Sequence, residues 1–589
     1  MVIPTDGRPP SYRFADLTLD VARRCVSRRG QPVELKTLDF DLLRFLVEQA
    51  PNVVTADLLA EKVWGRHFVS PENVSQRIKL LRHSLADDAS QPRYIETVRN
   101  KGHRLIPVVE TAGEPTSAPP RGSVAVLPFD NLSPDPNDAY FAIGIHDQIV
   151  SKLTQLGHLR VASRSSVQAY VAAKKSVPDI ARELQVATVL EGSVSYSGGR
   201  VRVTAHLSDG ATNANVWSRS YEHAFDDIFA IQSSIALAVA QALAAELLPS
   251  QRERVERRPT ASSSAYNVYL SAIARQFRDS RDELLLAIDE LEQAVTLDEN
   301  FIEAWVLDSN LRTTAQFFDP EHGDEHRAAG ERAARRALAL DPEHGDAHAA
   351  LGYALGFSKD WKGAEQAYRE AARLHVPLAN MHAYAVFKLA VADFSGAREI
   401  LDEAREAEPA NGTVLRFLVL ANASVGDWTT AEALYDSGRR LFTPWRQTDS
   451  GMMHWRVGRN ELTAARAVPP EGAINTAMIE QLDAPEAALA DLRRLYAASG
   501  SGNPDVRRDI ALWAAHFGDT ALALDAMRAA VSEQAEIVLY VWLPQFRPVR
   551  QLPEFKELLR DVGVVAHWEA YGWPAICQPV RDTDDFNCD

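Results

Sequence analysis

The stretch 73–105 constrains the fold more strongly than any other part of the chain. Within it, Val74, Ile78, Leu81 and Leu85 recur at i, i+4, i+7 and i+11, the spacing of one apolar face of an α-helix. The opposite face carries hydrogen-bond donors and cations and no acidic side chain: Ser75, Gln76, Arg77, Lys79, Arg82 and His83. Such a helix is suited to lie among phosphates and to contact base edges in a DNA major groove.

A β-hairpin with a basic tip is predicted directly after this helix. Two short β-prone runs within 94–105 flank Asn100, Lys101 and Gly102, a sequence typical of a tight turn. A donor-rich helix followed at once by a basic hairpin indicates a winged helix. The order of elements resembles the carboxy-terminal DNA-binding domain of OmpR/PhoB-type response regulators over residues 1–106. In that comparison Thr55 is predicted to cap the second helix of the domain.

The resemblance implies which side chains contact DNA. Residues that match Arg77, Lys79 and Arg82 face the major groove in that family, and those that match Thr97 and Arg99 belong to the wing, whose arginine enters the minor groove. The full predicted set is Ser75, Gln76, Arg77, Lys79, Arg82, His83, Thr97, Arg99 and Lys101. The chain departs from the family at Leu80, where many members carry a further arginine, so the base preference does not transfer.

The loop 64–71 before the recognition helix is a predicted contact with RNA polymerase, again by resemblance. Its contact residues would be Gly65, Arg66, His67 and Phe68. A polymerase contact favours activation of transcription over repression.

The charge distribution supports a DNA partner. Residues 1–106 contain 17 Lys and Arg and 13 Asp and Glu, a net charge of +4, in a chain whose formal net charge is −17. In an acidic protein, positive charge concentrated in one terminal module indicates that this module binds a polyanion. The alternatives are a small α/β domain whose basic helix is merely solvated and a winged helix kept for protein contacts.

Length and composition predict a multidomain protein. With 589 residues, 46% hydrophobic and 24% charged, the chain holds three or four ordinary globular units and is not disordered as a whole. Cys25, Cys577 and Cys588 lack metal-site spacing and indicate a reducing compartment, with two solvated thiols favoured in the tail. The most apolar window, 228–248, contains polar residues, so we expect no membrane span, no membrane partner and a cytoplasmic protein.

Residues 123–250 predict a small α/β sandwich with a mixed sheet. Residues 123–129 form an apolar run suited to a buried strand, and Gly198-Gly199 turns the strand 187–196 into the alternating strand 200–207. The segments 128–133, 190–193 and 217–221 resemble the TolB amino-terminal-like module. Since neither a phosphate-binding glycine loop nor a nucleophile elbow is present in the sequence, we expect no catalytic residue, no cofactor and no enzymatic activity.

The segment 262–575 predicts an α-solenoid of tetratricopeptide repeats. Small residues recur at Ala294, Ala337, Ala371, Ala404 and Gly438, with steps of 43, 34, 33 and 34 residues. The long first step implies an insertion around 317–324. The concave face of such an array would hold a peptide or protein partner. Four tryptophans are candidates to line it, although each is more typical of a core: Trp305, Trp361, Trp428 and Trp455. The His344/His348 pair is more typical of an exposed turn than of a metal site, so no metal is predicted.

Together these patterns predict a multidomain α+β and all-α protein. The expected divisions are a winged helix at 1–108, a linker at 109–122, the α/β domain at 123–250, the solenoid at 262–575 and a tail at 576–589. The order resembles membrane-anchored one-component activators of the CadC type, with the linker in place of their transmembrane helix. The predicted function is a one-component transcription regulator, an activator, that binds double-stranded DNA and whose α/β and repeat region senses a ligand or protein partner. A homodimer on paired half-sites is the expected binding form. The alternative is a repeat-based interaction scaffold with an auxiliary or vestigial DNA-binding domain.

Overall fold

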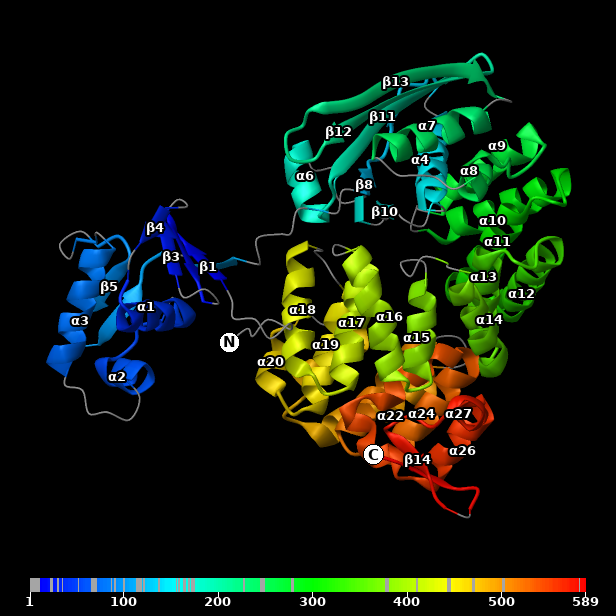
Figure 1. Ribbon diagram of the computed structural model, residues 1–589. Helices are drawn as coiled ribbons and strands as arrows, with labels where there is room; N and C mark the ends of the chain where they lie inside the picture. The colour runs from blue at the N-terminus through cyan, green and yellow to red at the C-terminus, as the bar shows by residue number, and fades with distance from the viewer. Residues whose placement is uncertain are drawn as a thin grey trace. The chain divides into compact units, whose positions relative to one another are not determined.

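The structure is a computed structural model in which two compact units are described separately, Met1–Ala118 and Pro119–Asp589 (Figure 1). The residues it describes are 11–21, 25–28, 31–33, 35–50, 52–64, 71–85, 87–88, 92–98, 101–107, 109–112, 119, 122–135, 138–154, 156, 159–162, 166–167, 170, 175–225, 228–243, 249–276, 280–374, 376, 381–408, 411–441, 446–468, 472–499, 504–581 and 583–589.

The first unit begins with an antiparallel sheet in the order β4-β3-β2-β1-β7. Its strands are β1 (Ser11–Phe14), β2 (Leu17–Asp20), β3 (Cys25–Arg28), β4 (Gln31–Val33) and β7 (Val109–Ala112). β7 pairs with β1 in the register Phe14↔Val109 to Ser11↔Ala112. The prediction of a linker at 109–122 is therefore wrong for residues 109–112. These four residues form a strand because they pair with the open edge of β1, whereas the Pro, Gly and Ser content of the whole segment had indicated a linker.

Three helices and a hairpin complete the first unit. They are α1 (Thr37–Gln49), α2 (Ala56–Trp64), α3 (Pro71–Ser84), β5 (Ile95–Val98) and β6 (Gly102–Leu105). The predicted apolar stripe of α3 is confirmed, since Val74, Ile78, Leu81 and Leu85 are at most 1% exposed. The predicted cap is confirmed as well, because the amide of Leu58 donates to Thr55 Oγ1 at 3.2 Å.

Gly102 lets the hairpin approach the segment before α2. His103 pairs with Val54 in an isolated bridge, with both backbone hydrogen bonds formed at 2.8 and 2.9 Å. Gly102 has φ +136°, and a Cβ at that position would lie 2.0 Å from the carbonyl oxygen of Val54. Only glycine fits here, which ties the hairpin to the helical part of the unit.

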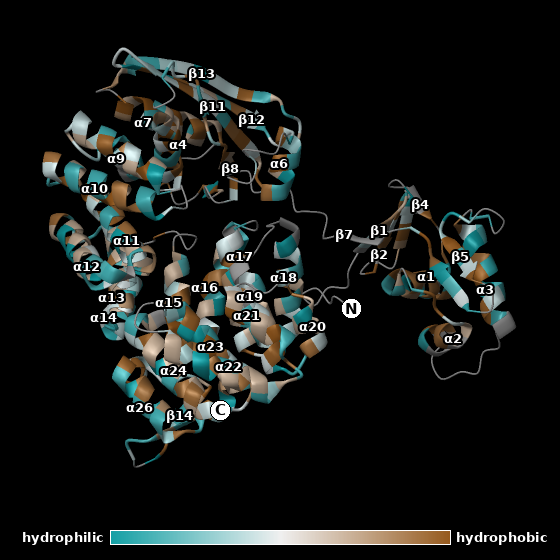
Figure 2. Cartoon of the chain, turned by 180° about the vertical axis from the view of Figure 1, so that it is seen from behind, coloured by the Kyte–Doolittle hydropathy of each residue, from teal (hydrophilic) through white to brown (hydrophobic). Residues whose placement is uncertain are grey.

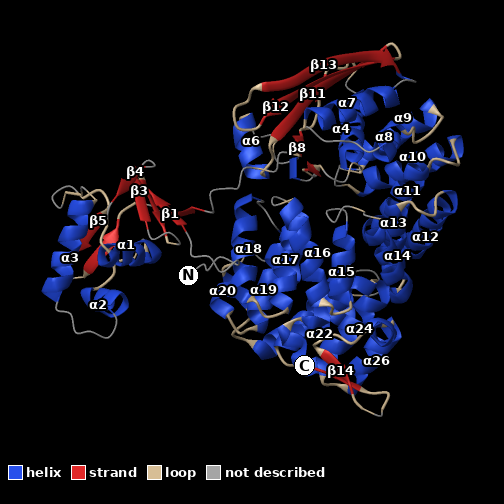
Figure 3. Cartoon of the chain, in the orientation of Figure 1, coloured by secondary structure: helices blue, strands red, loops and turns tan. Residues whose placement is uncertain are grey.

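The second unit opens with a mixed six-stranded sheet in the order β10-β8-β11-β12-β13, with β9 beside β11 (Figure 3). Its strands are β8 (Ser123–Val126), β9 (Asp130–Asn131), β10 (Arg160–Val161), β11 (Thr188–Ser197), β12 (Arg200–Asp209) and β13 (Asn215–Ala224). β8 pairs in parallel with β10 and β11, whereas β11, β12 and β13 are antiparallel. The predicted turn is confirmed: Gly198 and Gly199 have φ +57° and +74° and join β11 to β12.

Helices cover this sheet and continue into the helical array without a break in packing. They are α4 (Ala139–Thr154), α6 (Val177–Leu184), α7 (Ile228–Ala242) and α8 (Pro249–Glu256). The ring of Phe229 on α7 lies 4.3 Å from that of Tyr266 on α9 (Ser263–Arg275). The amide of Gln232 also donates to the Tyr266 hydroxyl at 2.7 Å. One hydrophobic core therefore spans the sheet and the first helices of the array.

The array consists of successive helices packed against their chain neighbours. They are α9 (Ser263–Arg275), α10 (Arg281–Leu297), α11 (Ile302–Phe318), α12 (Gly323–Leu340), α13 (Gly345–Phe357), α14 (Trp361–Arg373), α15 (His382–Ala390), α16 (Phe394–Ala407), α17 (Gly412–Ser424), α18 (Trp428–Leu441), α19 (Arg446–Gly458), α20 (Leu462–Arg466), α21 (Gly472–Glu480), α22 (Pro485–Ala498), α23 (Pro504–His516) and α24 (Thr520–Glu533). Ala294, Ala337, Ala371 and Ala404 are at most 1% exposed, so the small residues of the period do lie in the core. The long first step contains the short 3-10 helix η3 (Pro320–His322).

The end of the chain packs back on the middle of the array. After α24 come η5 (Ala535–Trp542), η6 (Pro544–Phe546), α25 (Arg547–Arg550), α26 (Pro553–Val562) and α27 (Val564–Tyr571). The indole of Trp361 on α14 donates to Val562 O at 2.6 Å, and the indoles of Trp568 and Trp542 donate to Val391 O and Ala390 O at 2.7 and 3.1 Å. Figure 1 shows these C-terminal helices beside α14 and α15. The C-terminal segment thus packs against α14 and the end of α15.

The tail differs from the prediction. β14 (Cys577–Pro579) and β15 (Phe586–Cys588) form a hairpin in which Cys577 pairs with Cys588, and the two sulfurs form a disulfide. The two cysteines are 0% and 4% exposed, so they are not solvated thiols. The antiparallel register places the cysteines opposite each other, which the sequence spacing alone did not require. The disulfide removes one observation on which the expected reducing compartment depended.

In the described part of the chain, none of the helices combines the length and the apolar character that a bilayer crossing requires. The helices alternate hydrophobic and hydrophilic residues along their length (Figure 2).

Candidate nucleic-acid interface

The outer face of α3 carries four of the six predicted DNA-binding side chains in exposed positions. These are Ser75, Gln76, Lys79 and His83. They are exposed because the apolar stripe on the opposite side of the helix is fully buried against the rest of the unit. This face combines a cation with neutral hydrogen-bonding groups, an inventory that serves both phosphate and base contacts.

Arg77 is turned toward α1. Its Nε lies 2.6 Å from Oδ1 of Asp39, and the two side chains are 20% and 4% exposed. Asp39 stands in the first turn of α1, so this ion pair joins the recognition helix to the helix beneath it. The role that the resemblance gives Arg77 in the major groove stays a prediction, since its charge already serves a contact within the protein.

Arg82 connects α3 with the hairpin. One Nη donates to the backbone oxygen of Ile95 at 2.8 Å and to Thr97 Oγ1 at 2.9 Å. Thr97 Oγ1 also lies 3.1 Å from Nδ1 of His103, whose pKa is lowered by burial and by the charge of Arg82. His103 and the Arg82 guanidinium therefore hold Thr97 in place. The roles of Arg82 and Thr97 toward DNA stay predictions.

Asp87 organises the start of the hairpin, and the sequence analysis missed it. Its carboxylate accepts hydrogen bonds from the amides of Arg93, Tyr94 and Ile95 at 2.6, 3.1 and 3.0 Å. The guanidinium of Arg82 is a charged neighbour of this carboxylate, with Nε 3.8 Å from Oδ2. The side chain is 0% exposed. The available signal was an acidic residue just after the helix and just before the first strand of the hairpin.

The structure describes only part of the predicted wing contacts and of the predicted polymerase loop. Lys101 is exposed at the turn between β5 and β6. Arg99 lies outside the described residues, and so do Gly65, Arg66, His67 and Phe68 of the predicted polymerase loop. Their assignments stay predictions.

Leu80 is the apolar exception on the outer face of α3. It is 47% exposed and stands next to Lys79. A leucine exposed to this extent on a helix otherwise lined by polar groups adds an apolar contact surface to the candidate interface.

Comparison with known proteins identifies the first unit. Residues 30–105 match the family model described as "Transcriptional regulatory protein, C terminal". The chain carries a winged-helix DNA-binding domain of the OmpR/PhoB type. The sensory transduction protein RegX3 of Mycolicibacterium smegmatis is 34% identical over 88 residues, 15% of this chain and 39% of that protein. The DNA-binding response regulator MtrA of Mycobacterium tuberculosis is 36% identical over 95 residues, 16% of this chain and 42% of that protein.

The chain is also similar, over a longer stretch, to a protein with a different description. The protein called "Putative adenylate cyclase 3" in Rhizobium meliloti is 36% identical over 178 residues, 30% of each chain. The chain thus spans between 30% and 42% of the length of these curated relatives. Among solved structures, the Klebsiella pneumoniae RstA DNA-binding domain in complex with the RstA box is 35% identical, covering 16% of this chain and 95% of that one, with a TM-score of 0.16. The DNA-binding domain of E. coli CadC is 31% identical, covering 18% and 98%, with a TM-score of 0.17.

The described residues contain no cluster of three or more His, Cys, Asp or Glu side chains placed to hold a metal ion. His344 caps α13, with Nδ1 accepting from the amide of Ala347 at 3.3 Å, and His348 Nε2 lies 2.9 Å from Pro342 O. Both histidines therefore take part in local turn and helix-cap contacts.

Proposed function

We propose that this protein is a one-component transcription regulator. Its winged helix binds double-stranded DNA, and the second unit receives the signal, a ligand or a protein partner. The observation that carries the proposal is the exposed polar face of α3 on a domain that matches DNA-binding regulators over residues 30–105. We include in the proposal that the helices from α9 onward are tetratricopeptide repeats and that the sheet module is TolB-like; the buried small residues at a period near 34 support the former.

Activation of transcription, contact with RNA polymerase and binding as a homodimer belong to the same proposal as expectations. A signal in the second unit can change DNA binding only if it favours one arrangement of the DNA-binding domains over another. Two domains on adjacent half-sites would gain affinity from their high effective concentration. We propose no enzymatic activity, because the sequence has no phosphate-binding glycine loop and no nucleophile elbow.

The first test compares how the DNA affinity of the natural protein and of Lys79→Ala depends on salt concentration. The Lys79→Ala protein should bind duplex DNA less tightly by about 1–3 kcal/mol if the side chain contacts a base. For a phosphate contact, affinity should fall on every sequence and the slope of log K against log salt should drop by about 1. Fluorescence anisotropy with labelled duplexes at several salt concentrations measures both quantities. Lys36→Ala, an exposed lysine before α1, is the matched control.

An intact protein that binds duplex DNA with no dependence on salt, or not at all, would overturn the proposed function. The interaction-scaffold alternative would then be favoured.

Leu80 is expected to influence which base the protein prefers. An exposed leucine on a recognition helix is suited to contact the C5 methyl group of thymine, which the major groove presents at A·T pairs. Leu80→Ala should therefore lose about 1 kcal/mol on sites with thymine at one position and almost nothing when uracil replaces that thymine. Selection of binding sites from a random duplex pool, followed by anisotropy on the thymine and uracil versions, measures the effect. An equal loss on both versions would contradict a methyl contact.

A further inference from the structure

The second unit contains a cavity of about 850 Å³ on the inner side of the helical array. Its lining comes from α11, α13, α14, α15, α17, α19, α21 and α23, and from η5. η5 packs against α13, α15, α23 and α24 and closes one side of the cavity. The remaining volume falls within the range of about 300–1,000 Å³ typical of small-molecule sites.

One wall of the cavity is aromatic. The ring of Phe357 lies 5.3 Å from that of Phe317 and 5.0 Å from that of Tyr353, both edge to face. Phe387, which also lines the cavity, lies 5.7 Å from the ring of Tyr368. These ring contacts hold the wall in place before any ligand binds. They suit an aromatic or alkyl body.

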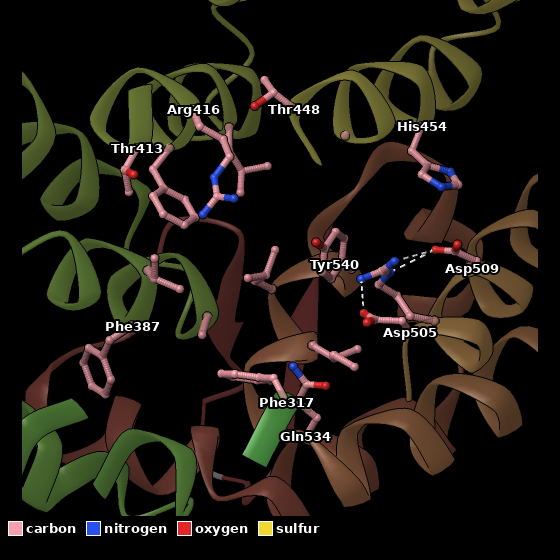
Figure 4. A pocket seen from close by; sticks show the side chains of 18 of the residues that line it. Phe317, Phe387, Thr413, Arg416, Thr448, His454, Asp505, Asp509, Gln534 and Tyr540 are labelled. Carbon is pink, nitrogen blue, oxygen red and sulfur yellow. Dashed lines mark hydrogen bonds and ion pairs between the residues drawn. The ribbon is translucent and has the colours of Figure 1, made fainter. Parts of the chain in front are cut away.

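Arg416 brings a positive charge to the other part of the cavity. It stands in the second turn of α17, and its guanidinium lies over the ring of Phe417 at 4.4 Å. Burial lowers the pKa of Arg416, against the influence of the Tyr540 phenol. Figure 4 shows the side chain reaching into the cavity. An anion placed beside a buried guanidinium forms a strong, charge-assisted hydrogen bond.

The second arginine of the cavity, Arg508, is occupied. It donates to Asp505 at 2.5 Å and to Asp509 at 2.8 Å, and it lies over the ring of Tyr540 at 4.9 Å. Two carboxylates therefore pair with this guanidinium, and Figure 4 marks the interactions of Asp505 and Asp509 with dashed lines. The imidazole of His454 adds no charge near pH 7, because burial lowers its pKa to about 3. Arg416 and Arg508 both line the cavity, and Asp505 and Asp509 pair with the second of them.

Two buried polar atoms on α19 point to a ligand independently. Thr448 Oγ1 and Trp455 Nε1 have no hydrogen-bond partner among the described residues, and the two residues are 4% and 3% exposed. Both residues line the cavity. A buried donor without an acceptor is costly, and a ligand oxygen would satisfy it. Both atoms can donate a hydrogen bond, so an acceptor group of a ligand would satisfy them.

We propose that this cavity binds an organic carboxylate with an aromatic or alkyl body, its carboxylate held by Arg416 and Thr448 and its body against the aromatic wall. The inference deepens the proposed function: the bound acid would be the signal that the second unit receives. Its regulatory role therefore rests on the proposed function. The binding step itself is independent of DNA.

Isothermal titration calorimetry on the full-length protein without DNA tests the site. The probes are 2-naphthylacetate, its neutral counterpart 2-naphthylacetamide, and decanoate. At least one carboxylate should bind, and the amide should bind at least tenfold more weakly than 2-naphthylacetate where that acid binds. The stronger of the two acids tells whether the wall prefers an aromatic or an alkyl body. Arg416→Met should lose at least tenfold for the preferred acid, whereas Arg373→Met, an exposed arginine paired with Glu370 on α14, should change nothing.

Thr448→Val keeps the test decisive if Arg416→Met fails to fold. Because the hydroxyl has no hydrogen-bond partner among the described residues, valine should leave the unfolding temperature of the free protein unchanged or raise it, while weakening binding of the acid severalfold. A purely structural threonine would not give these two effects together. No binding of either acid at millimolar concentration, equal binding of acid and amide, or an unchanged affinity in both variants would overturn the site. If the protein binds the acid but not DNA, the site is supported and the proposed function is wrong. If it binds DNA but neither acid, the proposed function is supported and the site is wrong.

Discussion

Replacing Asp87 by alanine is expected to destabilise the winged helix by about 3 kcal/mol or more. The change leaves the amides of Arg93, Tyr94 and Ile95 without their acceptor, and each buried hydrogen bond to a charged group contributes about 1.5–3 kcal/mol. Arg82 loses a neighbouring carboxylate at the same time. Such a loss is a large fraction of the roughly 5–15 kcal/mol that stabilises an ordinary domain.

Hydrogen exchange in the full-length protein would localise this effect. In Asp87→Ala, the amides of 93–105 should exchange faster than those of α1, and affinity for duplex DNA should fall because the hairpin is no longer held against α3. Asp87→Asn retains one acceptor oxygen and should fall between the two proteins. Glu96→Ala, which removes a partly exposed carboxylate of the hairpin that pairs with Arg104, serves as the control and should cost at most about 1 kcal/mol. Unchanged protection of 93–105 in Asp87→Ala would contradict the role given to this carboxylate.

Glu365 is expected to produce the second large effect, in the helical array. Its fully buried carboxylate accepts from Arg369 at 2.7 Å, Lys388 at 3.0 Å and Tyr384 at 3.1 Å, and lies 3.4 Å from His567 Nε2. It thereby joins α14, α15 and α27. Glu365→Ala should destabilise the second unit by about 3–5 kcal/mol, because it leaves the Lys388 ammonium buried without its main counter-charge.

Two controls separate the buried cluster from ordinary surface charge. Glu370→Ala, on the same helix but partly exposed and paired with Arg373, should cost at most about 1 kcal/mol. Adding Lys388→Met to Glu365→Ala should recover part of the loss, since it removes the buried charge that the first change left unpaired. Urea denaturation, followed by tryptophan fluorescence, measures the free energy of unfolding of the natural full-length protein and of these three variants. A loss for Glu365→Ala no larger than that for Glu370→Ala would show that the cluster contributes nothing special.

The same carboxylate predicts a dependence on pH. Burial alone would raise the pKa of Glu365, but His567, Arg369 and Lys388 hold it well below its ordinary value. A carboxyl with a lowered pKa stabilises the folded state above the unfolded value of 4.5, and this stabilisation is lost as the pH falls. The difference in stability between the natural protein and Glu365→Gln should therefore be largest near pH 7 and shrink toward acidic pH.

The sequence by itself determined the local elements of this protein. The apolar spacing of Val74, Ile78, Leu81 and Leu85 predicted the buried face of α3, and Gly198-Gly199 predicted the turn between two long strands; both were confirmed. These features depend on periodicity and backbone conformation over a few residues, which the order of amino acids states directly. The exposed positions of Ser75, Gln76, Lys79 and His83 follow from the same periodicity.

Only the tertiary structure decided which side chains are engaged within the protein. Arg77 and Arg82 have the same residue type as any DNA-contacting arginine, yet they pair with Asp39 and with the hairpin. The strand 109–112, the disulfide of Cys577 and Cys588 and the return of α27 onto α14 also join segments that are distant in the sequence or whose register the spacing leaves open. Charges, sheet edges and buried donors are satisfied by whichever partner the folded chain brings within about 3 Å, and that partner is a property of the whole arrangement, not of the local sequence.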